Sequence, residues 1–378
     1  MKIGFDGKRA LHNLRGLGNY SRTLIESLDI HFPENEYLLF SPPAKNAELS
    51  LWSDSLSTSS QIIGPRSFLT KKFPSVWRSL LLNKELSKFD LDVYHGLSHE
   101  IPPGINSSNF LKVVTIHDLL YLKFPKNFSV IDRNVYHRKF LYSVQNADIV
   151  VAICEQTKRD IIEYLKVPED KIHVVYQSCS PRFYEDASSD EKKVVSDKYE
   201  IKNEYIFHVA AMEPNKNTLS IVKAFKSIMN DVSHDLILVG RGGEYKNKVI
   251  SYIESENLKD RVKILEDVPM SDLPALYQMA SLFVFPSFYE GFGIPIIEAQ
   301  FSKTPVITSK GSCFPESGGP AAKYIDPSNV EEISNVMREV LMDGDLQKEM
   351  AQKGHEFVQK FHWKNTSKEL IDLYSTHL

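Results

Sequence analysis

The sequence contains few cysteines and no long apolar run. Among its 378 residues there are three cysteines, at positions 154, 179 and 313, and their wide separation argues against a disulfide framework or a cysteine-based zinc site. No apolar stretch is long enough to cross a bilayer, and the first residues carry no apolar segment of the signal-peptide type. We therefore expect a protein of a reducing, cytoplasmic compartment.

The chain also lacks a strong excess of charge of either sign. Its formal net charge is −4, which gives no global reason to expect a nucleic-acid partner, and we expect none. Its apolar content of 42% and charged content of 25% are those of a globular protein with a sizeable core. The length of 378 residues predicts two domains.

Short apolar runs alternate with longer amphipathic stretches, and the pattern starts twice along the chain. We expect strands at 3–5, 37–40, 93–95, 113–116, 149–153 and 173–176, then at 205–209, 236–239, 262–265, 282–285 and 305–308. Helical patterns lie at 20–28, 130–146, 156–165, 219–229, 245–256, 272–279 and 295–301. This alternation predicts an α/β fold with two parallel, doubly wound sheets.

The two halves are separated by a polar, charged stretch at 185–203, which is the best candidate for a linker. We expect one domain at 1–185, a second at 200–360, and a separate amphipathic helix at 361–378. Ligands of doubly wound sheets bind at the carboxyl ends of the strands, so the residues that follow each strand are the candidates for a site.

The most informative segment follows the strand expected at 282–285. It places Glu290 in a glycine-flanked turn, Gly291-Phe292-Gly293, and Glu298 eight positions after the first glutamate. Pro295 suits the first position of a helix, whose free N–H groups and positive dipole end would then face the turn and bind a phosphate. Glu298 falls one turn into that helix, where its carboxylate can accept from two adjacent hydroxyls. Together these features predict a nucleotide-sugar site.

Residues 285–299 resemble the paired-glutamate signature of the retaining glycosyltransferases of family 4. The resemblance implies that Glu298 holds the ribose hydroxyls of the nucleotide and that Glu290 lies near the donor sugar and diphosphate. It also implies the GT-B fold, in which two Rossmann-like domains face a cleft. In that fold the second domain holds the donor, the first holds the acceptor, and the last helix crosses back to the first domain.

A second candidate element, residues 210–217, follows the strand at 205–209 and resembles the E-P-R-K-N loop of the same family. Lys216 is placed to meet a phosphate as a point charge, and Asn217 is a suitable N-cap for the next helix. Many family members carry an arginine where this chain has Ala211. Arg241, after the next strand, is the candidate for a compensating cation.

The first half offers weaker candidates. His117 and Asp118 end the strand at 113–116, and family members show a similar His-Asp-Leu near the donor sugar and acceptor. A histidine can donate or accept near neutral pH, but a ring satisfied by backbone groups is the alternative. Gly16 and Gly18 could let backbone N–H groups approach a phosphate, or could be a helix-entry turn.

Residues 65–89 combine six Lys or Arg residues with interleaved aromatic and leucine side chains. Such a segment can lie on an anionic membrane surface, and many relatives in the family act on lipid-linked acceptors. We favour the other interpretation, a helix that packs its apolar face and exposes its basic face. A peripheral contact at the inner face of the membrane therefore stays an open expectation.

The resemblance implies an enzyme that moves a hexose, of mannose or glucose type, from a nucleoside diphosphate sugar to an acceptor hydroxyl with retained anomeric configuration. Its setting would be glycan, polysaccharide or lipopolysaccharide assembly. We expect His117, Lys216 and Glu290 to be catalytic, and the donor to be bound by Gly16, Gly18, Asp118, Arg241, Gly291, Phe292, Gly293 and Glu298. No Asp-x-Asp triplet of the metal-dependent type lies near the candidate site, so we expect neither a metal nor a cofactor beyond the sugar nucleotide.

Departures from the family pattern leave two alternatives. Residues 300–303 and 177–180 differ from the common family sequence, as does Ala211, which suggests a catalytically weak nucleotide-sugar-binding subunit of a transferase complex. Another enzyme on the same fold, a phosphorylase or an epimerase, is the second alternative. A nicotinamide-dependent dehydrogenase is disfavoured because Gly16-Leu17-Gly18 lacks a third glycine at the expected spacing.

Overall fold

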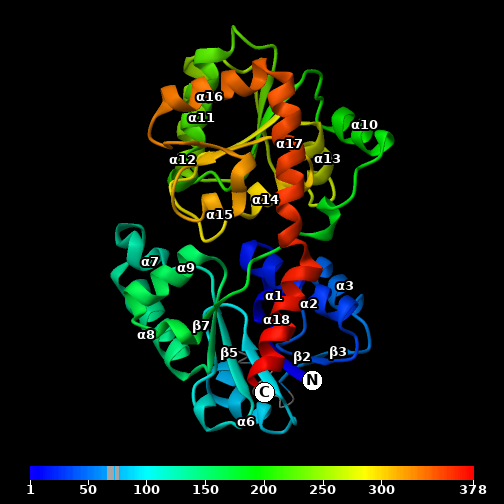
Figure 1. The fold of residues 1–378 in the computed structure, drawn as a ribbon, viewed down its shortest axis with the longest axis vertical. Helices are drawn as coiled ribbons and strands as arrows, with labels where there is room; N and C mark the ends of the chain where they lie inside the picture. Colours follow the sequence, from blue (N-terminus) through cyan, green and yellow to red (C-terminus); the bar gives the residue numbers. More distant parts are fainter. Residues whose placement is uncertain (66–71, 73–75) are drawn as a thin grey trace. The chain divides into compact units, whose positions relative to one another are not determined.

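The computed structural model describes residues 1–65, 72 and 76–378. They form two compact units, one made of Met1–Ser180 with Phe361–Leu378 and the other of Pro181–Lys360. Figure 1 shows each unit as an α/β layer structure with its helices on both faces of a sheet.

Unit 1 contains a seven-stranded sheet in the order β3-β2-β1-β4-β5-β6-β7, with every neighbouring pair parallel. The strands are β1 Lys2–Asp6, β2 Glu36–Phe40, β3 Ser60–Ile63, β4 Val93–Gly96, β5 Leu111–Ile116, β6 Ile149–Ala152 and β7 Ile172–Val174. The strand order reverses direction between β1 and β4, which creates the crevice typical of dinucleotide-fold sheets.

Helices cover both faces of this sheet. The helices of unit 1 are α1 Lys8–His12, α2 Gly16–His31, α3 Ala47–Asp54, α6 Leu82–Leu86, α7 Leu120–Lys123, α8 Val130–Asn146, α9 Glu155–Asp160 and α18 Trp363–His377, with π-helical turns at Trp77–Leu81 and Ile161–Leu165. Apolar residues of α2 and α18 form one core with the sheet, and those of α6, α8 and the second π-helical turn form the other.

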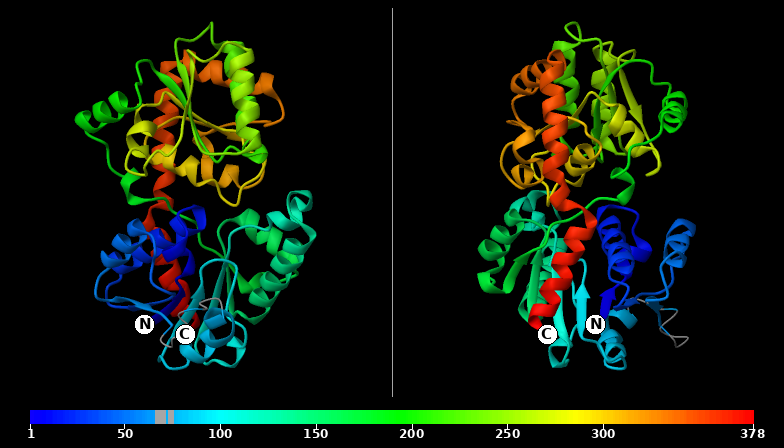
Figure 2. Two further views of the ribbon diagram at one scale, coloured as in Figure 1. Left: turned by 180° about the vertical axis from the view of Figure 1, so that it is seen from behind. Right: turned by 45° about the vertical axis from the view of Figure 1, so that its right-hand side comes forward.

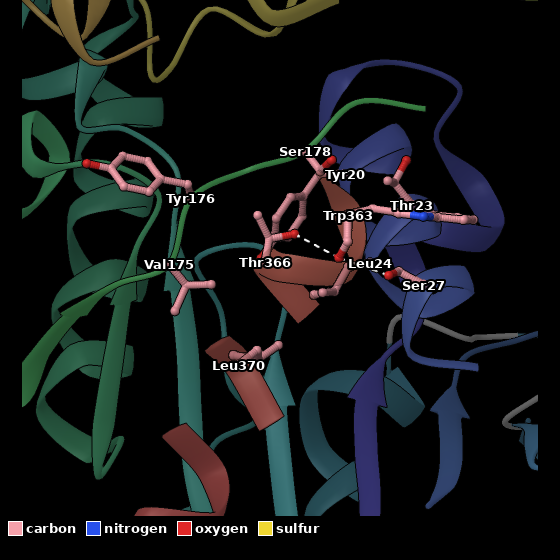
Figure 3. Close-up of a pocket in the computed structure, with 10 residues that line it drawn as sticks. All are labelled: Tyr20, Thr23, Leu24, Ser27, Val175, Tyr176, Ser178, Trp363, Thr366 and Leu370. Atoms are coloured by element: carbon pink, nitrogen blue, oxygen red, sulfur yellow. Dashed lines mark hydrogen bonds between the residues drawn. The ribbon is translucent and has the colours of Figure 1, made fainter. Parts of the chain in front are cut away.

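The last helix, α18, completes the core of unit 1. Leu370 and Tyr374 are buried against the sheet, and the Tyr374 hydroxyl lies 2.6 Å from Nδ1 of the buried His95. Ser27 of α2 donates to the Trp363 carbonyl at 3.0 Å, and Figure 3 shows these two residues beside a small pocket under α18. The predicted return of the last helix to the first domain is confirmed, as Figure 2 also shows.

Unit 2 contains a six-stranded parallel sheet in the order β10-β9-β8-β11-β12-β13. The strands are β8 Tyr205–Val209, β9 Asp235–Val239, β10 Val262–Leu265, β11 Leu282–Phe285, β12 Val306–Ser309 and β13 Lys323–Ile325. Numbered from β8, this is the order 3-2-1-4-5-6 of the Rossmann fold, and the order reverses between β8 and β11. The carboxyl ends of those two strands therefore mark the expected ligand crevice.

The helices of unit 2 are α10 Ser189–Lys198, α11 Thr218–Ile228, α12 Glu244–Ser255, α13 Leu273–Met279, α14 Ile294–Phe301, α15 Phe314–Gly318, α16 Val330–Met342 and α17 Gly344–Val358. Helices α11, α12 and α16 bury an apolar core against the sheet. Tyr277 of α13 packs edge-on against Phe207 of β8, with ring centroids 5.0 Å apart. This aromatic contact fixes α13 beside the strands that carry the site.

The predicted α/β fold with two Rossmann-like sheets is confirmed, but several local predictions change. Strands β3 and β13 were not predicted. The stretch 185–203, expected as a linker, instead contains α10, which begins with a capping box between Ser188 and Glu191 and belongs to unit 2. Its polar composition reflects an exposed helix rather than an irregular connection.

Candidate functional site

The residues predicted from the two loops at the crevice of unit 2 come together in an ion pair. Lys216 follows β8 and Glu290 follows β11, and the Lys216 ammonium lies 2.6 Å from both carboxylate oxygens of Glu290. The two side chains are only 19% and 14% exposed. A cation and an anion are thus held at the topological switch point of the sheet, where ligands of this fold bind.

Hydrogen bonds between the loops keep these two residues in place. Asn217, with φ at +59°, donates from its side-chain amide to the carbonyls of Pro286 at 3.3 Å and Pro327 at 2.6 Å. The Phe288 N–H donates to the Asn215 carbonyl at 2.9 Å. Asn217 is the N-cap residue of α11, as predicted, but its side chain makes no capping bond to the helix, because its amide joins three loops instead.

The glycine turn after Glu290 leads directly into α14. Gly293 precedes the helix with φ at +93°, a conformation that favours glycine, and Phe292 is buried. The helix begins at Ile294, so Pro295 occupies its second position and not the first. The first N–H groups of the helix and the positive end of its dipole lie at the turn, which makes it suited to an anion.

Glu298, on α14, is a buried residue whose carboxyl group is held by the hydroxyl of Tyr277. Its side chain is 8% exposed, and the Tyr277 hydroxyl donates to its Oε2 at 3.0 Å. Burial raises the pKa of Glu298 to about 7, although the hydrogen bond from Tyr277 lowers it. A buried carboxyl group with a raised pKa is a marker of a binding site.

Arg241, the proposed second cation, lies on the surface after β9. Its side chain is 75% exposed and forms an ion pair with Asp267. The described contacts of Arg241 therefore do not bring its guanidinium to Lys216 or Glu290.

His117 lies in unit 1 with both ring nitrogens engaged. Nδ1 accepts from the Gln177 amide at 2.7 Å and Nε2 donates to the Leu97 carbonyl at 2.9 Å, while the Tyr20 ring packs edge-on. Burial lowers the pKa of His117 to about 4, so the ring is neutral at pH 7. This is the satisfied histidine that was the alternative interpretation, and direct contact with a substrate stays a prediction.

The other candidates of unit 1 have local structural roles. Asp118 Oδ1 accepts from the Leu120 N–H at 3.1 Å, at the start of α7. Gly16 and Gly18 lie within the first turn of α2 and not in a loop before it. A Cβ on Gly18 would stand 1.7 Å from the Asn13 carbonyl oxygen, so close packing explains that glycine, whereas Gly16 has open space around it.

The basic stretch 65–89 is described in part, because residues 66–71 and 73–75 lie outside the described residues. Within the described part, Trp77, Leu82 and Leu86 are buried in the core, and Arg78 pairs with Asp6 at 2.6 Å and with Glu100 at 3.2 Å. These apolar side chains are used in packing, which supports the interpretation favoured from the sequence.

Two residues that contact candidates, one in each unit, were missed as functional candidates. Tyr277 stands in the Leu-Pro-Ala-Leu-Tyr run, which carried the family resemblance without a role for the tyrosine, and Gln177 was noted only as a departure from the family pattern. Tyr277 contacts Glu298 and Gln177 contacts His117, and the two members of each pair are distant in sequence. Among the described residues, no group of three or more His, Cys, Asp or Glu residues is arranged to hold a metal ion.

Two family models match the chain. The model "Glycosyl transferases group 1" matches residues 189–357, and the model "Glycosyltransferase Family 4" matches residues 34–180. The chain belongs to the group 1, family 4 glycosyltransferases. It is therefore an enzyme of the hexosyltransferase class with the GT-B fold, and the predicted family and fold are confirmed.

Curated relatives and solved structures agree with this assignment. O-antigen chain mannosyltransferase B of Escherichia coli is 27% identical over 384 residues, covering 99% of each chain. O-antigen chain mannosyltransferase RfbU of Salmonella typhimurium is 31% identical over 230 residues, covering 61% of this chain and 60% of the relative. HepE of Anabaena, solved with UDP and glucose, has a TM-score of 0.76 at 18% identity and covers 100% of both chains.

Proposed function

We propose that this glycosyltransferase moves a mannose-type hexosyl group from a nucleoside diphosphate hexose to a hydroxyl of a glycan or lipid-linked acceptor, with retained anomeric configuration. The observation that carries the proposal is the Lys216–Glu290 pair at the switch point of unit 2, with Glu298 on the helix that begins four residues after Glu290. The full-length O-antigen mannosyltransferase relative supports the mannose-type donor, and HepE with UDP and glucose supports a sugar nucleotide on this fold.

The chemical problem in this reaction is the negative charge that develops on the departing diphosphate. Cationic groups and N–H donors aimed at that charge stabilise the transition state. Lys216 and the N–H groups at the start of α14 supply them, assisted by the turn Gly291-Phe292-Gly293. The diphosphate competes with Glu290 for the Lys216 ammonium, which frees the Glu290 carboxylate for the hydroxyls of the donor sugar.

Glu298 binds the ribose of the donor, because an ionised carboxylate accepts from two adjacent hydroxyls. Unit 1 binds the acceptor, and His117 contributes as a neutral ring held by its neighbours rather than as an acid. For Gly16, Gly18, Asp118 and Arg241, whose described surroundings show no link to the Lys216–Glu290 pair, contact with the donor stays a prediction. The reaction proceeds without a metal or a further cofactor, on the cytoplasmic side of O-antigen or polysaccharide assembly.

The test is thermal stabilisation of the purified chain by UDP, GDP, ADP and dTDP, followed by transfer assays with the matching nucleotide hexoses. A ligand at about 100 times its Kd should stabilise the folded state by about 2.7 kcal/mol. Glu298→Ala should remove most of the shift. Lys216→Ala should lower kcat more than it weakens donor binding, because its charge matters most in the transition state.

Two results would contradict this proposal. Wild-type kinetic constants for Lys216→Ala would remove the assigned role of that lysine. A nucleotide-dependent shift without any transfer by the chain alone would favour a binding subunit of a transferase complex, in line with the alanine at position 211.

A further inference from the structure

A series of contacts between buried side chains links α18, the last helix of unit 1, to the ring of His117. The Tyr374 hydroxyl of α18 lies 2.6 Å from Nδ1 of His95, whose Nε2 lies 2.7 Å from the Thr115 hydroxyl. The Thr115 hydroxyl lies 3.3 Å from the Tyr20 hydroxyl. The Tyr20 ring packs edge-on against His117, with ring centroids 4.6 Å apart, and all five residues are buried. The position of α18 is thus connected to His117 through the core.

His95 is the central group of this network. Burial lowers the pKa of His95 to about 3, so its ring is neutral at pH 7 and carries one N–H. One of the two hydroxyls at its nitrogens therefore accepts a hydrogen bond from the ring, and the other donates one. Loss of either hydroxyl leaves a nitrogen of His95 buried without its partner, which is costly and favours movement of the neighbouring side chains. Thr115 precedes His117 by two residues, so such a movement occurs beside His117.

A second side chain, that of Gln177, holds the His117 ring directly. The Leu97 carbonyl, 2.9 Å from Nε2 of His117, can only accept, so Nε2 carries the proton of the neutral ring. Nδ1 is therefore the acceptor, and the Gln177 amide donates to it at 2.7 Å. Gln177 thus selects one tautomer and one orientation of the ring.

These two supports stand on the two chain segments that join the units. The chain leaves unit 1 after Ser180, three residues beyond Gln177. It returns to unit 1 at Phe361, two residues before the start of α18, which carries Tyr374. Each connection between the units therefore includes, or leads into, a segment whose side chain bears on His117.

We infer that Gln177 and Tyr374 are positioning residues that hold His117 in the orientation that transfer requires, one on each connection between the units. Gln177 acts by its bond to the ring, and Tyr374 acts through His95, Thr115 and Tyr20. The inference rests on the part that His117 has in the proposed function. Misplacement of a group in a site by about 1 Å can lower the rate by about 100-fold, so loss of either support should be visible in kcat.

The test is steady-state transfer by Tyr374→Phe, with GDP-mannose or UDP-glucose as the donor, whichever the nucleotide panel selects. The matched control is Tyr37→Phe, because Tyr37 is buried in the same apolar core and its hydroxyl donates to the Leu28 and Phe32 carbonyls and not to the network. Both variants should unfold at a lower temperature, since each leaves a buried group without its partner. Only Tyr374→Phe should lower kcat, by about tenfold, with the donor KM unchanged.

Two further variants separate the hydroxyl of Thr115 from its size. Thr115→Val removes the hydroxyl on the other side of His95 and should reproduce the loss of kcat. Thr115→Ser keeps that hydroxyl and should restore most of the rate. A merely structural role of the network would give losses that follow the unfolding temperature instead.

Gln177→Glu tests the direct support. A carboxylate at Nδ1 favours the charged ring, so the pKa of His117 should rise from about 4 towards neutrality. Transfer should then fall as the pH is lowered through this raised pKa, whereas wild-type transfer should show no loss from His117 in that range.

The ring of His117 can also be observed directly, by NMR of the chain with ¹³C-labelled histidine and with the signal assigned by His117→Gln. Tyr374→Phe and Thr115→Val should shift this signal, and Tyr37→Phe should leave it in place. An unshifted signal in Tyr374→Phe, or a loss of kcat that Tyr37→Phe matches, would overturn the inference. The nucleotide-induced thermal shift should persist in every variant; its absence from the wild type would contradict the proposed function, while the NMR comparison would still test the positioning of His117.

Discussion

Replacing Glu298 by glutamine should stabilise the protein in a strongly pH-dependent way. Burial raises the pKa of this carboxyl from 4.5 to about 7 in the folded state. The folded state therefore holds the proton more tightly than the unfolded state does, and stability falls as the pH rises from about 4.5 to about 7. At 1.36 kcal/mol per pH unit, the ionised carboxylate costs the folded state about 3 kcal/mol at pH 8.

The assay is urea unfolding of the wild type and Glu298→Gln at pH 5, 6, 7 and 8. The glutamine variant does not titrate, so its advantage in unfolding free energy over the wild type should grow by about 2 to 3 kcal/mol between pH 5 and pH 8. Glu331→Gln, which removes an exposed carboxylate in the first turn of α16, is the matched control and should not reproduce this gain.

The same substitution should remove the binding of the donor. Ribose hydroxyls favour the ionised carboxylate, so the affinity of the wild type for a nucleoside diphosphate hexose should fall about tenfold per pH unit below pH 7. A sugar nucleotide is the right probe because its diphosphate does not titrate near neutrality. A stability difference that stays constant from pH 5 to pH 8 would refute the reasoning, since it would mean that the pKa of Glu298 is the same in the folded and the unfolded chain.

Two further substitutions test the support of this site. Tyr277→Phe removes the hydrogen bond that favours the ionised form of Glu298, so the pKa of Glu298 and the pH below which donor affinity falls should both move upward. Titration calorimetry from pH 6 to pH 9 measures this shift. An unchanged pH profile would mean that Tyr277 has no positioning role. Gly293→Ala places a Cβ on a residue with φ at +93°, 3.1 Å from the Ile296 side chain, and should lower the free energy of unfolding in urea by about 1–3 kcal/mol. Gly344→Ala is the control: that position has open space around it, so the free energy of unfolding should change little.

Most strands and helices could be predicted because their apolar pattern is local. Strand β8 has the predicted bounds, since its first four residues are buried and the fifth, Val209, is partly buried, as expected of a strand covered on both faces. Strand β13, by contrast, has three residues and lies at the edge of its sheet, so it carries no distinctive pattern. The polar segment containing α10 was taken for a linker because its surface-exposed helix buries only Val195.

The sequence predicted which residues belong to the candidate site, but it did not predict which residues they contact. The sequence places Lys216 and Glu290 after separate strands, and the parallel sheet explains why the two meet. The partner of Glu298 could not be predicted, because Tyr277 lies on another helix 21 residues earlier and reaches the carboxylate only through tertiary packing. The same holds for His117, whose ring is held by the Leu97 carbonyl and by the side chain of Gln177, 60 residues away.

The way the chain divides between the units also determines the order in which they can mature during synthesis. Unit 2 is an insertion within unit 1, because residues 181–360 stand between the first 180 residues and α18. The sheet of unit 1 is synthesised first. About half of the chain must then be synthesised before α18, with Leu370, Ile371 and Tyr374, can pack on this sheet. Until then part of the apolar face of this sheet stays uncovered, and exposed apolar surface of this kind promotes misassembly.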